Sequence, residues 1–100
     1  MTLVGQQNFD WHFERGNQFL ENGELDSAFF HFQHAESLCR DVLSTRTVRI
    51  ENKLGQIDDL LAQRKSSREH FRKALTLSTQ IEDSLGMGDA YSNLAASFTY

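Results

Sequence analysis

The stretch AFFHFQHA at residues 28–35 has a counterpart, SREHFRKA, at residues 67–74. Each stretch begins with a small residue, carries a phenylalanine four residues later and ends in an alanine, so that Phe32 matches Phe71. This spacing is typical of a helix that buries one face. The two stretches therefore predict the same kind of buried helix at two places in the chain.

The repetition extends outward into the segments that precede these helices. Gly16, Gly55 and Ala95 align, and Phe19 and Phe98 each follow the aligned small residue by three positions. A period of about forty residues is typical of stacked supersecondary units, none of which can bury its apolar face alone. The sequence therefore predicts a repeat architecture, and such an architecture favours a binding function.

The pattern resembles the tetratricopeptide repeat (TPR) family, in its lengthened variety, because the period exceeds the usual spacing of about 34 residues. The resemblance implies an all-α stack of antiparallel helix pairs, with about two and a half repeats in one domain over residues 1–100. We expect the chain to be a fragment of a longer solenoid. Asp58 departs from the family pattern, which has an aromatic there, and His12 and Arg15 replace large apolar groups.

Apolar periodicity and helix-end signals predict where the helices lie. Five helices are expected, at residues 7–22, 24–41, 45–64, 66–82 and 86–100. The residues expected to separate or cap them are Asn22 with Gly23, Ser44 or Thr45, a capping box of Ser66 and Glu69, and Asp83 or Ser84.

Composition excludes several classes of partner. The 100 residues include no proline, 39% are apolar, and the net charge is −4, so the chain offers no basic field for nucleic acid or anionic membrane. No apolar run has the length of a spanning helix, and the N-terminus lacks the features of a signal peptide. The single cysteine, Cys39, fits a reducing compartment. We therefore expect a cytoplasmic protein.

By resemblance, the first helix of each pair lines a concave groove that binds a protein or an extended peptide. The candidate partner-binding residues are Phe13, Asn17, Arg49, Asn52, Lys53, Gln56, Ser92 and Asn93. Other positions at the same helical phase are Asp10, Leu20, Asp59, Asp89, Ala96 and Thr99. Amide side chains suit a peptide backbone because each offers a donor and an acceptor, and Arg49 and Lys53 suit a carboxylate. Alternatively, each position is simply a solvated site on an exposed helix face.

One specific family function can be compared with the residues. Members that bind chaperone tails hold a C-terminal carboxylate with Lys and Asn on the first helix, Asn on the third, and Lys and Arg on the fifth. The matching places here hold Phe13, Asn17, Lys53, Asp89 and Asn93. Only Asn17 matches, so a carboxylate clamp is not expected. Asn93 does match the asparagine with which lengthened-repeat adaptors hold a ligand backbone.

The alternative function is self-association. Leu94 and Phe98 occupy the face of the last predicted helix that would meet a following helix, so we expect a second copy to cover them. A further group of aromatics forms either a dense core at the N-terminal end of the stack or a patch for a partner: Trp11, Phe13, Phe29 and Phe30.

An enzyme is the third alternative. His31 and His34 are three residues apart, so they share a helical face, and Glu36 or Cys39 could complete a metal site. Ligands on a single helix rarely enclose a tetrahedral ion, and Cys39 lies on the apolar stripe, which favours a core role. We predict no catalytic residue, no metal site and no cofactor.

Overall fold

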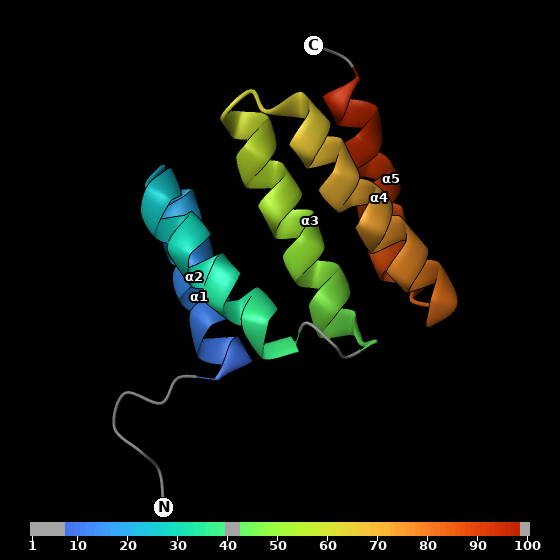
Figure 1. Cartoon of the computed structure of the whole chain (residues 1–100), viewed down its shortest axis with the longest axis horizontal. Helices are drawn as coiled ribbons and strands as arrows, with labels where there is room; N and C mark the ends of the chain where they lie inside the picture. The colour runs from blue at the N-terminus through green and yellow to red at the C-terminus, as the bar shows by residue number, and fades with distance from the viewer. Residues whose placement is uncertain (1–7, 40–42, 99–100) are drawn as a thin grey trace, which may run out of the picture.

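The computed structural model describes residues 8–39 and 43–98, and this part of the chain is all-α. The helices are α1 (Phe9–Glu21), α2 (Leu25–Cys39), α3 (Thr45–Leu60), α4 (Arg64–Gln80) and α5 (Ser84–Ser97). Figure 1 shows α1 and α2 side by side as one hairpin, and α3 and α4 as a second hairpin beside α5. The largest interhelical contacts are those of α3 with α4 and of α1 with α2.

The predicted number and order of helices are confirmed, but several bounds are not. α3 ends at Leu60 instead of residue 64, α4 begins at Arg64 instead of 66, and α5 begins at Ser84 instead of 86. The predicted termini at residues 7, 40–41 and 99–100 lie outside the described residues.

The α3–α4 boundary differs because the chain turns earlier than predicted. Ala62 adopts a left-handed conformation (φ 61°), and the backbone N–H of Gln63 donates to the Asp58 carbonyl oxygen at 2.8 Å. This bond ends α3 in a single tight turn. The predicted capping box of Ser66 and Glu69 is wrong, because Ser66 lies inside α4 and its Oγ donates to Asp58 Oδ2 at 2.5 Å.

Two of the predicted helix caps are confirmed. Ser44 Oγ accepts a hydrogen bond from the Thr47 N–H at 3.5 Å, and Asp83 Oδ1 accepts one from the Gly86 N–H at 3.0 Å. These bonds satisfy backbone donors that a helix start leaves free. Gly23 separates α1 from α2 with φ 77°, a conformation that glycine adopts without strain.

The two hairpins pack in the same way. Gly16 contacts the ring of Phe32, and Gly55 contacts the ring of Phe71, so closely that a methyl group on either glycine would overlap the ring. Both phenylalanines are completely buried. The equivalence of Phe32 and Phe71 that the repeat predicted is therefore present in the packing.

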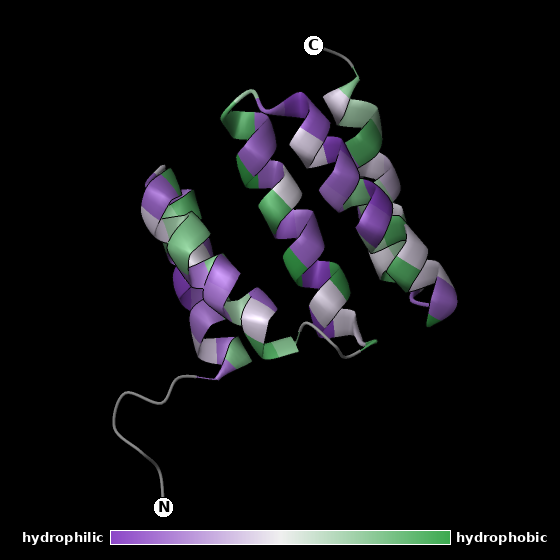
Figure 2. Ribbon diagram, in the orientation of Figure 1, coloured by the Kyte–Doolittle hydropathy of each residue, from purple (hydrophilic) through white to green (hydrophobic). Residues whose placement is uncertain are grey.

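The apolar core has two parts. The larger part joins α1, α2 and α3, and the smaller one joins α3, α4 and α5 through Val48, Ala74 and Ala90. Figure 2 shows that each helix also carries polar residues, as expected of helices that bury one side. Among the described helices, none combines the length and apolarity needed to cross a bilayer.

Candidate ligand groove

The eight residues proposed from the sequence to bind a partner lie together in space. They line a single hollow of about 460 Å³, with Asp89 as a ninth lining residue. α1 supplies two of them, α3 four and α5 two. The structure thus brings the predicted residues into one groove, while their role in binding remains a prediction.

Hydrogen bonds between amide side chains connect α3 to α5 across the groove. Gln56 Nε2 donates to Asn93 Oδ1 at 3.3 Å, and Asn93 Nδ2 donates to Asn52 Oδ1 at 3.1 Å. Each of these three hydrogen-bonded amides fixes the orientation of the next, because an amide oxygen only accepts and an amide nitrogen only donates. Asn93 is therefore held in place before any ligand arrives.

Asn17 on α1 has an unused hydrogen-bonding capacity. Its Oδ1 is buried, and no donor among residues 8–39 and 43–98 meets it. A buried acceptor without a partner is unfavourable, because it has lost its hydrogen bond to water. An N–H group placed in the groove by a ligand would restore that bond.

The groove carries charges of both signs. Arg49 and Lys53 lie on α3, one turn apart, and Asp89 faces them from α5. Arg49 is exposed and Lys53 is half-buried, so both ammonium and guanidinium groups can reach a ligand in the groove. This arrangement favours a ligand with a carboxylate near α3.

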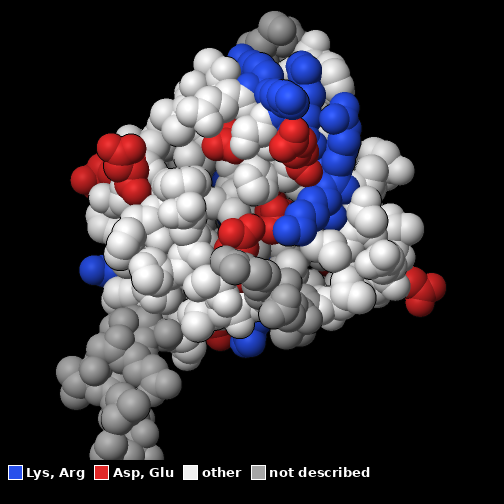
Figure 3. Space-filling model, in the orientation of Figure 1, with Lys and Arg blue, Asp and Glu red and all other residues white. Residues whose placement is uncertain are grey.

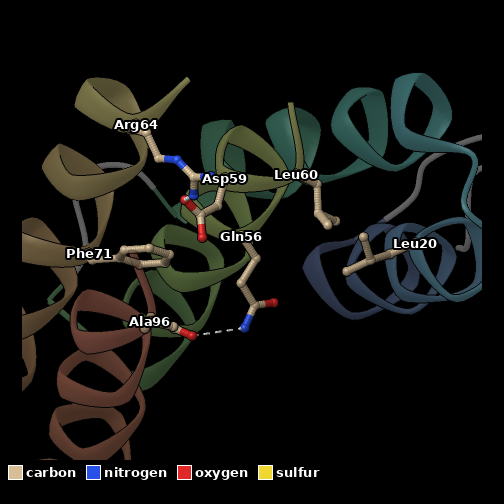
Figure 4. A pocket seen from close by; sticks show the side chains of 8 residues that line it. Leu20, Gln56, Asp59, Leu60, Arg64, Phe71 and Ala96 are labelled. Atoms are coloured by element: carbon tan, nitrogen blue, oxygen red, sulfur yellow. Dashed lines mark hydrogen bonds and ion pairs between the residues drawn. The ribbon is translucent and has the colours of Figure 1, made fainter. Parts of the chain in front are cut away.

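A second hollow of about 540 Å³ adjoins the first, and Gln56 and Asn93 line both. Figure 4 shows Leu20 and Leu60 on one side of it and the ring of Phe71 on the other. Arg64 Nη1 donates to Asp59 Oδ1 at 2.6 Å, so the Asp59 carboxylate already has a cationic partner. The second hollow is more apolar than the first and extends the groove towards the α3–α4 turn.

The other residues predicted to share the helical phase of the groove lie in different places. Leu20, Asp59 and Ala96 line the second hollow. Asp10 is exposed and forms an ion pair with Arg46 at 3.4 Å. Thr99 lies outside the described residues.

The proposed self-association residues, Leu94 on α5 and Phe98 directly after it, are not equally exposed. Leu94 is half-buried, whereas Phe98 is 59% exposed. The guanidinium carbon of Arg68 lies 4.0 Å from the centre of the Phe98 ring, and Arg68 Nη2 donates to the Ser97 carbonyl oxygen at 2.9 Å. Arg68 on α4 therefore covers one side of the Phe98 ring.

The aromatic group in the first hairpin is partly a surface feature. Trp11, Phe29 and Phe30 are exposed, and Phe13 is half-buried against the core. The sequence left open whether these four aromatics form a dense core or a surface patch, and the dense core accounts for Phe13 only.

The histidines of the first hairpin pair across two helices and not along one. His31 Nδ1 lies 3.1 Å from His12 Nδ1, which is a hydrogen bond when one ring is neutral. The Phe19 ring stacks on the His31 ring, with the ring centres 5.5 Å apart. Burial lowers the pKa of His12 and of His31, and neighbouring positive charges lower both further.

Cys39 occupies the core position that its periodicity predicted. It is buried, and burial raises the pKa of its thiol. A raised pKa disfavours the thiolate, which is the nucleophilic and metal-binding form.

A buried polar cluster in the second hairpin was missed by the sequence analysis. Its centre is Glu51 on α3, whose Oε1 accepts a hydrogen bond from His70 Nδ1 at 2.7 Å. Lys73 Nζ lies 3.4 Å from Glu51 Oε2, and Asp58 Oδ2 lies 3.6 Å from His70 Nε2. The repeat contained the necessary signal, because Glu51 and His70 are the counterparts of His12 and His31.

The charges of this cluster shift its pKa values in opposite directions. The hydrogen bond to Glu51 raises the pKa of His70. Burial opposes ionisation of Glu51, but hydrogen bonds and nearby cations hold its pKa below the usual range. Burial, together with the adjacent Glu51, raises the pKa of Glu36 on α2.

No protein-family model matches this chain, and neither does any curated protein or solved structure with which it was compared.

Proposed function

We propose that the chain is a TPR-like module that binds an extended segment of another protein in the groove between α1, α3 and α5. The observation that carries this proposal is the convergence of eight sequence-selected residues on one hollow. Three features support a peptide ligand in particular: amides fixed in orientation, a buried acceptor that no donor of the described residues meets, and two cations on α3. A peptide backbone supplies the donors and acceptors that match such amides.

The ligand that fits best is an extended peptide with an acidic side chain. Its backbone N–H would donate to Asn17 Oδ1, and its carboxylate would lie near Arg49 and Lys53. Apolar residues of the same peptide would occupy the adjoining hollow beside Leu20 and Leu60.

An array of extended peptides, probed with the isolated chain, tests this proposal. The Asn17→Ala, Asn52→Ala, Asn93→Ala triple variant should bind more weakly by about 1–3 kcal/mol for each buried hydrogen bond lost. The matched control is the Gln33→Ala, Gln80→Ala double variant, which removes exposed amides from α2 and α4. Circular dichroism should show the same helix content in all three proteins. Equal affinity of the triple variant and the parent would rule out the groove as the binding site.

Self-association is the second candidate, and the exposure of an aromatic residue on α5 and of another directly after it favours this function. Tyr91 is 62% exposed and Phe98 is 59% exposed. Burying side chains of this kind stabilises by about 1.5–3 kcal/mol each. Sedimentation velocity over a range of concentrations should then reveal a larger species, and the Leu94→Glu, Phe98→Lys variant should remove it. A parent chain that sediments as a monomer at every concentration would exclude this function.

A further inference from the structure

The buried cluster of the second hairpin adjoins Glu36 of the first hairpin, so three helices bring metal-binding atoms together. Glu36 comes from α2, Glu51 from α3 and His70 from α4. One ligand atom of each lies within 4.8 Å of those of the other two. Two carboxylate oxygens and an imidazole nitrogen form a ligand set that suits divalent transition metals. The cluster shares no residue with the groove.

Glu51 Oε2 in this cluster has no hydrogen-bond partner in the described part of the chain. Glu51 has a side chain only 1% exposed, yet its Oε2 accepts no hydrogen bond from any of the described residues. Its ion pair with Lys73, at 3.4 Å, involves a side chain that is 55% exposed. The nearby cations favour the charged form of Glu51, but the Lys73 ammonium is largely exposed and leaves this buried oxygen without a hydrogen bond. A bound cation would supply the missing interaction.

The surroundings of His70 match those of a metal-binding imidazole. Its Nδ1 faces Glu51, while its Nε2 lies 3.6 Å from Asp58 Oδ2, which in turn accepts a hydrogen bond from Ser66 Oγ. Metal-bound histidines usually direct the second ring nitrogen to a carboxylate of this kind, which fixes the tautomer and the ring orientation. Asp58 would perform that function here.

We propose that Glu36, Glu51 and His70 bind a Zn²⁺ ion that links α2, α3 and α4. Zinc lies about 2.0–2.2 Å from oxygen and nitrogen ligands, so atoms around a tetrahedral ion are about 3.3 Å apart. Atoms already within 4.8 Å of one another reach that separation through small side-chain rotations. Water completes the coordination. Two carboxylates neutralise the ion, and Lys73 is released to solvent. Because α2 belongs to the first hairpin and α3 and α4 to the second, the ion fastens the two hairpins together.

Titration of the metal-free full chain with Zn²⁺ and with Co²⁺ tests this site. Calorimetry should give one ion per chain, Co²⁺ should produce visible absorption bands of a low-coordinate complex, and either ion should raise the unfolding temperature. The Glu36→Gln variant removes a half-buried ligand and should weaken Zn²⁺ binding at least about tenfold. The Lys73→Met variant should strengthen binding, because it removes the cation that competes for Glu51 Oε2.

Two control variants distinguish this site from other positions that could hold an ion. His31→Gln changes the counterpart of His70 in the first hairpin, and Lys65→Met removes an exposed lysine of α4. Both should bind Zn²⁺ as the parent does. Loss of binding in His31→Gln would place the ion among the histidines of the first hairpin and overturn the proposal. Undiminished binding in Glu36→Gln, or no binding by the parent at about 1 mM Zn²⁺, would overturn it as well.

Discussion

The same positions of the repeat hold a pair of histidines in the first hairpin and a histidine with a carboxylate in the second. In the first hairpin, His12 and His31 form a pair beside the Phe19 ring. In the second, the equivalent pair is Glu51 and His70, and an aspartate takes the place of Phe19. The packing of glycine against phenylalanine is common to both.

This difference shows that a repeat can keep its packing and still change the charge in its interior. The first pair is stable when at least one imidazole is neutral, because two positive rings whose Nδ1 atoms lie 3.1 Å apart repel each other. The second pair favours a positive imidazole beside a carboxylate. In Figure 3 the Lys and Arg side chains gather along the edge of the molecule that contains α4, next to several carboxylates. The second hairpin is thus the more ionic of the two.

The largest expected effect concerns what the hairpins share. Phe32→Ala and Phe71→Ala should each reduce the free energy of unfolding by about 3–5 kcal/mol, because both rings are buried against a glycine. Denaturant unfolding measures this loss. Phe30→Ala, at an exposed position of the same helix as Phe32, is the control and should stay within about 0.5 kcal/mol of the parent. A large difference between Phe32→Ala and Phe71→Ala would contradict the equivalence of the two hairpins.

The second prediction is that, in the metal-free protein, the stability contributions of His31 and His70 depend on pH in opposite ways. The folded-state pKa of His31 lies below its unfolded value of about 6.5, so its contribution to stability is present above that pH and is lost as the pH falls. The folded-state pKa of His70 is raised, so its contribution is present below about pH 6.5 and is lost as the pH rises through the folded pKa.

Unfolding experiments on single variants from about pH 8 to about pH 5.5 measure these contributions. Lowering the pH should widen the difference in stability between the parent and His70→Gln. It should narrow the difference between the parent and His31→Gln. If both differences move in the same direction, the two pairs do not have the opposite charge preferences that their geometry indicates.

A third variant converts one pair into the other. His12→Glu places a carboxylate next to His31 where the parent has an imidazole. The pKa of His31 should rise, because the positive ring gains a hydrogen bond to a negative charge. NMR titration of the His31 ring measures the change, with His70 of the second hairpin as an internal reference. A His31 pKa that stays low would mean that burial beside Phe19, and not the identity of residue 12, controls this ring.

The smallest expected effect concerns the turns within the hairpins. Gly23 and Ala62 occupy equivalent positions, both with a left-handed backbone. Gly23→Ala should destabilise the chain by about 1 kcal/mol, and Ala62→Gly should stabilise it by up to about 1 kcal/mol, because only glycine adopts this conformation without strain. Thermal unfolding measures both. Destabilisation by Ala62→Gly would show that the extra flexibility which glycine gives the unfolded chain outweighs the relief of strain in the folded state.

Much of the fold followed from apolar spacing alone. Helix number, helix order and the equivalence of Phe32 and Phe71 were predicted from the sequence. A periodic apolar stripe on a helix must be buried, whichever residues of the neighbouring helix pack against it. The α3–α4 boundary was predicted incorrectly, because Ser66 has the sequence features of a cap while its hydroxyl bonds to Asp58. A local pattern cannot reveal which distant acceptor a hydroxyl meets.

The candidate groove was predictable because its residues recur at one helical phase, and stacked hairpins place one phase on one side. The sequence by itself therefore determined the number and order of the helices, their repeat and the set of residues that line the groove. The tertiary structure alone decided which amides bond to each other and that no donor in the described part of the chain meets Asn17 Oδ1. It also decided that Glu36 of α2 meets Glu51 and His70. The physical reason is that side-chain contacts between helices depend on the angle and separation of the helices, which the spacing of residues along one helix does not specify.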